Sequence, residues 1–281
     1  MPGRVASAAL RLSSLLLTLP ILSAFAVPSP SPWERIVLIG ASVSAGFTES
    51  EPLGGTQTPR YCLSRYVNAA VAVPHQPALN LASTLFFLRP EAEGKRQIEL
   101  ARQARPTLVL GLDFLFWFCY GEGRTGTERL QRFEQGLKLL ETLECPVVVG
   151  DLPDASSSIN RMLSPAQIPD AGTLAAANRR LKAWAARRPG CAILPLAAFM
   201  RSVLANRAVT VHGQLLPAGA TRALLQEDKL HPSPSGAAFL AVALLDSVQS
   251  AARLRLEQDI HWDYTQVLRL GSLPSARAAT P

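Results

Sequence analysis

The sequence lacks the features that would assign it to a nucleic-acid-binding or a metal-binding class. It contains no block of Lys and Arg interleaved with aromatic side chains, which is the usual electrostatic footprint of a nucleic-acid surface. The cysteines follow no zinc-type spacing, so the sequence gives no sign of a zinc site. Charged residues are scarce at 17% and apolar residues make up 48% of the chain, which excludes wholesale disorder and allows a large core.

The sequence also lacks an apolar run long enough to span a bilayer. Its N-terminal apolar stretch, 15–26, falls short of the roughly 20 residues that a transmembrane helix needs, and Pro20 interrupts it. Arg4 and Arg11 precede this stretch and an Ala-Phe-Ala sequence ends it, which predicts a secretory signal peptide over 1–26. An uncleaved anchor is the alternative. We therefore expect an exported protein, periplasmic or secreted, that contacts a membrane only through this segment.

Few cysteines and a modest excess of basic residues leave two further questions open. The four cysteines are Cys62, Cys119, Cys145 and Cys191, an even number that permits up to two disulfides in an exported chain or, alternatively, buried free thiols. The net charge of +7 becomes +5 when the two signal-peptide arginines are subtracted, and a solvated basic surface explains it.

Short apolar runs recur along the chain after a Pro- and Ser-rich spacer over 27–34. Each is four residues or fewer and stops at a polar residue or a turn, as buried strands of a parallel sheet do. The five expected strands are 36–39, 78–81, 108–110, 147–149 and 192–194.

Amphipathic helical patterns separate these runs and a long apolar one follows them. The expected helices are 63–73, 96–104, 128–143, 171–187, 196–206 and 237–254. Strands that alternate with helices indicate βαβ units, hence an α/β fold with a five-stranded parallel sheet and helices on both faces. We place one domain over 35–256 and a partly disordered tail over 257–281, and we expect a short hairpin over 209–216 with its turn near Gly213.

An acid and a histidine stand three residues apart just before the last helix. Asp228 and His231 would lie on the same side of one turn, so the carboxylate could hold one imidazole nitrogen while the other faces outward. Pro232 keeps His231 out of the helix interior, and Ser233 or Ser235 could cap the helix that begins near Gly236. Such a pair needs a nucleophile.

A serine directly after the first strand supplies the candidate. Ser42 lies in the turn Gly40-Ala41-Ser42-Val43-Ser44-Ala45-Gly46, where a hydroxyl is exposed at the carboxyl edge of the sheet with its own N–H free. The alternative is that Ser42 merely caps the following helix, but Ser44 fits that role and the Asp228–His231 pair favours the nucleophile.

Two sequence blocks resemble those of the SGNH (GDSL) hydrolases, closest to the thioesterase/lysophospholipase-like branch. The stretch 39–47 is similar to the first block of that family, and Asp228-Lys229-Leu230-His231-Pro232-Ser233 fits its last block. The resemblance covers about 35–255. It implies a three-layer αβα sandwich of flavodoxin-like type and a serine esterase without metal or organic cofactor.

By that resemblance, Ser42 is the nucleophile, His231 the general base and then acid, and Asp228 the group that supports the imidazolium. The family's oxyanion donors would correspond to the N–H of Ser42, a backbone N–H near Ser83, and Asp113. The family has Asn where this chain has Asp113, and an ionised carboxylate cannot donate to an oxyanion. Burial would have to raise the pKa of Asp113 for it to donate.

The aromatic run 114–120 follows the third strand and suggests a substrate pocket in which Phe114 and Trp117 are candidates. The expected substrate is a small-molecule, lipid or glycan ester, including thioesters, and nucleic acid is not expected. Two other functions stay open: a non-catalytic or weakly active ester- or glycan-binding protein, and an acyltransferase that uses the same serine.

Overall fold

A single parallel sheet carries the functional residues at its carboxyl edge. The computed structural model describes residue 3 and residues 31–252 and 257–273. The sheet has the order β2-β1-β3-β4-β5 and every pair in it is parallel. Its strands are β1 (Ile36–Leu38), β2 (Leu79–Asn80), β3 (Leu108–Gly111), β4 (Val147–Gly150) and β5 (Cys191–Leu194). The five expected strands are confirmed to within about two residues at each end.

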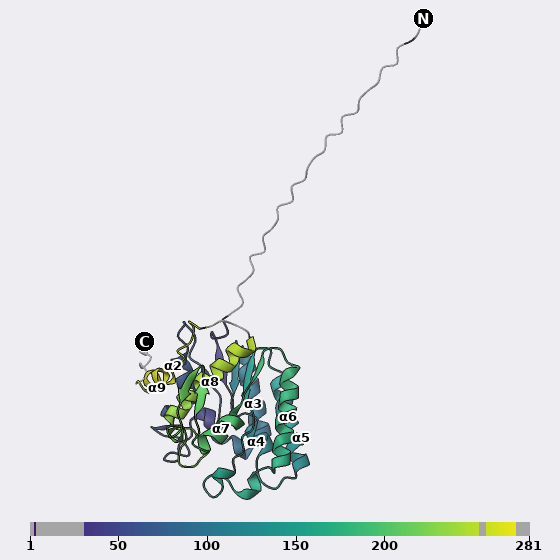
Figure 1. The fold of residues 1–281 in the computed structure, drawn as a ribbon. Coiled ribbons are helices and arrows are strands. Elements are labelled where there is room, and N and C mark those ends of the chain that lie inside the picture. The colour runs from purple at the N-terminus through teal and green to yellow at the C-terminus, as the bar shows by residue number, and fades with distance from the viewer. Residues whose placement is uncertain (1–2, 4–30, 253–256, 274–281) are drawn as a thin grey trace.

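Helices cover both faces of this sheet (Figure 1). They are α1 (Ser42–Ala45), α2 (Leu63–Ala70), α3 (Pro90–Gln103), α4 (Phe116–Cys119), α5 (Gly126–Glu141), α6 (Ala171–Ala186), α7 (Leu196–Leu204), α8 (Pro234–Ala252) and α9 (Tyr264–Ser272). Five single turns of 3-10 helix lie in the loops: η1 (Thr58–Arg60), η2 (Phe86–Leu88), η3 (Ser156–Ser158), η4 (Pro165–Gln167) and η5 (Thr221–Leu224). The arrangement is the three-layer αβα sandwich expected from the sequence, with the flavodoxin-like strand order.

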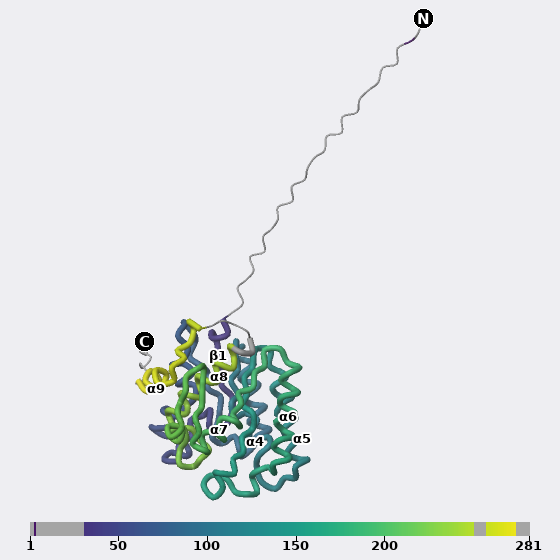
Figure 2. The backbone as a smooth tube through the Cα atoms, viewed as in Figure 1, coloured from purple at the N-terminus to yellow at the C-terminus, as the bar shows by residue number. Residues whose placement is uncertain are grey.

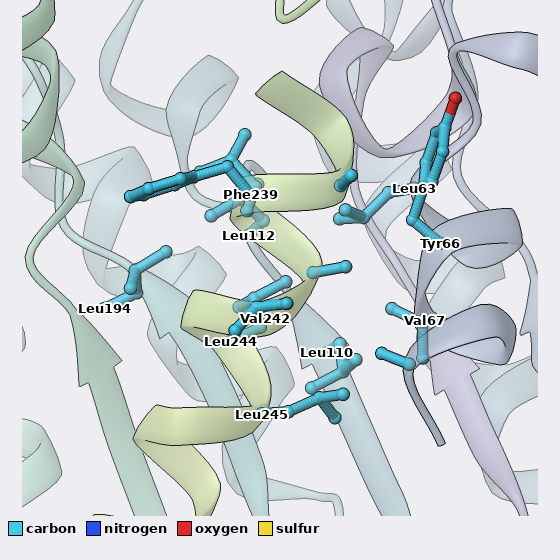
Figure 3. Close-up of a cluster of buried hydrophobic side chains, with 14 of the residues drawn as sticks. Leu63, Tyr66, Val67, Leu110, Leu112, Leu194, Phe239, Val242, Leu244 and Leu245 are labelled. Carbon is cyan, nitrogen blue, oxygen red and sulfur yellow. The ribbon is translucent and has the colours of Figure 1, made fainter. Parts of the chain in front are cut away.

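Two hydrophobic clusters fill the space on either side of the sheet. The first lies under α2, α7, α8 and α9, where Val242 and Leu245 of α8 face Leu110 of the sheet and Val67 of α2 (Figure 3). The second lies under α3, α4, α5 and α6, and it includes Phe86, Phe114 and Phe118. The central strands β1, β3 and β4 are buried on both faces because each cluster takes alternate side chains from the same strand.

The hairpin and the helix cap agree with the sequence analysis. Strands β6 (Val209–Val211) and β7 (Gln214–Leu216) pair antiparallel around Gly213. The Ser233 hydroxyl accepts a hydrogen bond from Gly236 N at 3.1 Å, so Ser233 caps α8. All four cysteines are free thiols, as in the second of the two alternatives considered for them.

The expected domain boundaries were wrong at both ends. Trp33, assigned to the spacer, is fully buried in the first cluster and donates through Nε1 to Asp259. The segment 257–273, assigned to the tail, forms a bridge at Ile260 and helix α9. α9 packs against α2 and α8, on the opposite side of the molecule from α5 and α6 (Figure 2). An isolated tryptophan and one short amphipathic helix carry too little periodicity to reveal that both pack against the domain.

The expected signal peptide over 1–26 (apart from residue 3), residues 27–30 of the spacer, residues 253–256 and the last eight residues lie outside the described residues. Within the described part of the chain, no helix combines the length and the hydropathy that crossing a bilayer requires.

Candidate active site

Ser42, His231 and Asp228 form one continuous hydrogen-bonded line. His231 Nε2 lies 2.8 Å from Ser42 Oγ, and His231 Nδ1 lies 2.6 Å from Asp228 Oδ2. Ser42 is partly exposed, whereas the side chains of His231 and Asp228 are almost completely buried. The structure therefore brings together the three residues that the sequence singled out, although 189 residues separate the serine from the histidine. This is the geometry that activates a serine hydroxyl.

The loop over 226–231 holds the acid and the imidazole through its own backbone. Asp228 Oδ1 accepts from the N–H groups of Leu230 and His231, both at 2.9 Å, while Oδ2 faces the imidazole. Burial acts against the charged carboxylate, but the hydrogen bonds from His231 and from Leu230 N outweigh it and lower the pKa of Asp228. Asp228 is therefore ionised at neutral pH and is able to stabilise an imidazolium.

Two residues that the sequence analysis missed connect this loop to the serine turn. The ring of Phe47 packs on the His231 imidazole with 4.2 Å between centroids. Gln226 Nε2 donates to the carbonyls of Phe47 and Pro232, both at 2.9 Å. Because Phe47 lies about 180 residues from this loop in the chain, the only sequence signal was its position after the Ala-Gly pair of the first block.

Asp113 organises the serine turn instead of donating to an oxyanion. Its Oδ2 accepts from Val43 N at 2.8 Å and from Ser44 N at 3.4 Å, and the Ser44 hydroxyl donates to Oδ1 at 2.6 Å. Burial raises the pKa of Asp113, and these hydrogen bonds act in the other direction. The expectation that Asp113 supplies an oxyanion donor was wrong because every recorded contact of its carboxylate is that of an acceptor. Ser44, expected to cap α1, instead binds this carboxylate.

Gly40 permits this arrangement. A Cβ at Gly40, where φ is +146°, would lie 2.2 Å from Asp113 Oδ1, so only glycine fits. The buried amide of Gln97 fixes the same residue, since its Oε1 accepts from Gly40 N at 2.7 Å and its Nε2 donates to Gly40 O at 3.0 Å. Gln97 was not found from the sequence because it lies on the buried face of α3 without a motif.

One N–H of the turn stays available. The next amide along the turn, Val43 N, donates to Asp113, and within the described part of the chain Ser42 N has no recorded acceptor. This agrees with the open N–H expected at the nucleophile.

The second backbone donor does not come from Ser83. Its N–H donates to Gly40 O at 3.1 Å, and its hydroxyl accepts from Leu85 N, so that prediction was wrong. Ala82 N is equally engaged, with Asn80 Oδ1 at 3.1 Å. Thr84 is the next residue, it lines the pocket, and among the described residues its N–H has no recorded partner.

A pocket of about 520 Å³ contains Ser42 and His231 in its wall. Residues that follow all five strands of the sheet line it, together with residues from η5, the His231 loop and α8. Trp117 lines it as expected, and its neighbour Phe116 does too. Phe114 does not: it is fully buried in the second cluster, where it packs against Phe86 and Phe118. Phe114 precedes α4 and packs under it, whereas Phe116 and Trp117 lie at the start of the helix and reach the pocket, and this local geometry was not visible in the sequence.

Comparisons with known proteins add to this geometry. No family model matches the chain, and no curated protein matches its sequence. The structure of the lipase/acylhydrolase from Enterococcus faecalis superposes with a TM-score of 0.51 at 16% identity, over 81% of this chain and 97% of that one. The fold is SGNH hydrolase-like.

Two other structures superpose less closely. A catalytic mutant of Axe2, an acetylxylan esterase from Geobacillus stearothermophilus, has a TM-score of 0.49 at 18% identity over 76% of this chain and 94% of that one. TesA has a TM-score of 0.46 at 15% identity over 78% and 99%. At these identities the SGNH-like likeness concerns the fold, and the chemistry rests on the residues of this chain.

Proposed function

We propose that this protein is an exported serine esterase that hydrolyses carboxylic or thioesters through an acyl-serine intermediate. The observation that carries the proposal is the line from Ser42 Oγ through the His231 ring to Asp228, with hydrogen bonds of 2.8 and 2.6 Å. The triad opens into a pocket, so a substrate carbonyl can approach the hydroxyl. The superposed lipase/acylhydrolase has the same fold and agrees with this reaction class. The signal-peptide pattern of 1–26 supports export.

In the proposed first half-reaction, His231 Nε2 removes the proton of Ser42 as Oγ attacks the ester carbonyl. The tetrahedral oxyanion accepts hydrogen bonds from the N–H groups of Ser42 and Thr84, and the ionised Asp228 stabilises the imidazolium. His231 then returns the proton to the leaving oxygen or sulfur, and the acyl group stays on Ser42.

In the second half-reaction, water attacks the acyl-serine while His231 again acts as base. The proton then passes to Ser42, and the carboxylic acid leaves. No step requires a metal, and the described residues contain no cluster of three or more ligating side chains.

The decisive experiment combines an ester assay with covalent labelling. The purified protein should hydrolyse p-nitrophenyl esters and react with a fluorophosphonate probe at Ser42. Ser42→Ala should lose both, with kcat lower by at least about 10⁴-fold. Ser50→Ala is the matched control because this exposed hydroxyl contacts Thr48 and not His231. Retention of activity in Ser42→Ala would refute the nucleophile assignment, and hydrolysis without probe labelling would refute the acyl-serine mechanism.

A further inference from the structure

The wall of the candidate catalytic pocket is mostly apolar, and His231 is the one basic side chain among its described lining residues. More than half of its described lining consists of Leu, Met, Phe and Trp side chains, among them Phe47, Phe87, Phe116, Trp117, Met200 and Leu240. No Lys or Arg belongs to the described lining. A pocket of this kind favours a hydrocarbon group and gives an anionic group no counter-charge.

The acidic residues of the wall reinforce this preference. Asp113 is engaged with the serine turn, and Asp151 Oδ1 accepts from Ala197 N at 2.6 Å. Glu49 is the third, and it is exposed. Burial raises the pKa of Asp113 and of Asp151, and none of the three carboxyl groups can give a phosphate or a second carboxylate a counter-charge. An acetylated sugar would fill little of the 520 Å³ and would place its hydroxyls against hydrocarbon.

The lining divides into two sides with Ser42 between them. Leu224, Met200 and Leu240 belong to the first hydrophobic cluster, the one under α8, and His231 lies at the start of that helix. Trp117 belongs to the second cluster, and its ring contacts that of Phe87 with 5.6 Å between centroids. The leaving oxygen must come within hydrogen-bond reach of His231 Nε2, so the alcohol belongs on the α8 side. The acyl chain then extends toward Trp117 and Phe87.

We infer that the substrates are uncharged esters of medium- or long-chain apolar acids, and that the acyl chain binds against Trp117 and Phe87. This inference rests on the proposed esterase function and adds the substrate class to it. Phe87 is 44% exposed and Leu85 46%, so apolar surface continues from the pocket wall to its mouth. The acyl chain can therefore exceed the enclosed part of the pocket.

A matched series of esters tests the substrate class. With p-nitrophenyl acetate, butyrate, octanoate and laurate, kcat/KM should rise by about tenfold to 100-fold from acetate to octanoate, because each buried methylene contributes up to about fourfold. The p-nitrophenyl monoester of suberic acid replaces the terminal methyl of octanoate by a carboxylate, and its kcat/KM should be lower by at least about tenfold. Fluorophosphonate labelling of Ser42 in the same preparation tests the esterase function separately.

Equal kcat/KM with the octanoate ester and the suberate monoester would overturn the substrate class, and so would faster hydrolysis of the acetate ester or of an acetylated sugar. In either case, labelling at Ser42 would still support the esterase function. Loss of labelling and of all hydrolysis would instead overturn the esterase function itself.

A pair of neighbouring substitutions tests where the acyl chain lies. Phe87→Lys places a cation in the pocket wall. The ratio of kcat/KM for the octanoate ester to kcat/KM for the suberate monoester should therefore fall by at least about threefold. Leu88→Lys is the control, because Leu88 is 62% exposed, belongs to the same turn η2 and does not line the pocket. In Leu88→Lys this ratio of kcat/KM values should stay that of the parent. An equal fall of the ratio in both variants, or no fall in either, would overturn the inference that the acyl chain binds against Trp117 and Phe87.

Discussion

The two halves of the candidate catalytic centre differ in how closely they follow the SGNH pattern. The proton-transfer half, Asp228 and His231, keeps the sequence of the family's last block and makes both of its hydrogen bonds in the structure. The oxyanion half departs from the pattern at Asp113, where the family has Asn. There the Asp113 carboxylate accepts hydrogen bonds from backbone N–H groups of the serine turn, the turn that a substrate would approach.

The difference shows which parts of such a site depend on side-chain identity. A general base needs an imidazole and a carboxylate in fixed positions, so that half tolerates little change. An oxyanion donor needs only an N–H in the right place, and any residue except proline supplies one. In this structure Asp113 and Gln97 hold the serine turn by hydrogen bonds, and Gly40 leaves room for the Asp113 carboxylate.

The largest effect is expected in the proton-transfer half. Asp228→Asn should lower kcat by about 10³- to 10⁴-fold, because an amide can donate to Nδ1 and so favour the wrong imidazole tautomer. The variant should fold, since Asn can still accept from Leu230 N and His231 N. Ester hydrolysis at pH 7 to 9 and circular dichroism would measure both. A loss of less than about tenfold would show that Asp228 does not support the imidazolium.

A smaller loss is expected in the oxyanion half. Thr84→Pro removes one backbone N–H and should lower kcat by about 10²- to 10³-fold. Thr84→Ala keeps the N–H and should stay within about threefold of the parent, which makes it the matched control. Thermal unfolding shows whether the proline disturbs the loop. Equal activity of the two variants at equal stability would remove Thr84 from the oxyanion site.

Much of this architecture was predictable from the sequence because its signals are local. Each strand is a short apolar run, and the turn at Ser42 and the loop at His231 are contiguous motifs. The fold, the hairpin at Gly213 and the order of the triad residues along the chain followed from these. Periodicity alone did not assign roles to the triad residues. Those roles came from the resemblance, and the distances came from the structure.

The rest depended on contacts between distant segments. Phe47 on His231, Gln97 on Gly40 and Trp33 on Asp259 join residues far apart in the chain, and none has a motif. Ser83 and Asp113 were misassigned because alignment to a family block gives a position in the sequence but not the direction of an N–H or a carboxylate.

The smallest effect is expected when Asp113 is replaced by Asn, the residue that the SGNH pattern has at this position. Asp113→Asn can keep every contact, since its oxygen accepts from the backbone of the serine turn and its amide donates to the Ser44 hydroxyl. We therefore expect catalytic turnover within about threefold of the parent, because the new amide faces Ser44 and not the oxyanion.

The stability of this variant should depend on pH in a direction fixed by the pKa of Asp113, which burial raises. A carboxyl group whose pKa is raised on folding contributes stability while it is protonated at low pH, and loses it as pH rises through the folded-state pKa. The parent should thus lose stability relative to Asp113→Asn as pH increases, and urea unfolding between pH 4 and 8 measures the difference. If Asp113→Asn instead turned over about 100-fold faster than the parent, the side chain at 113 would reach the oxyanion, and the two halves of the centre would follow the same family pattern after all.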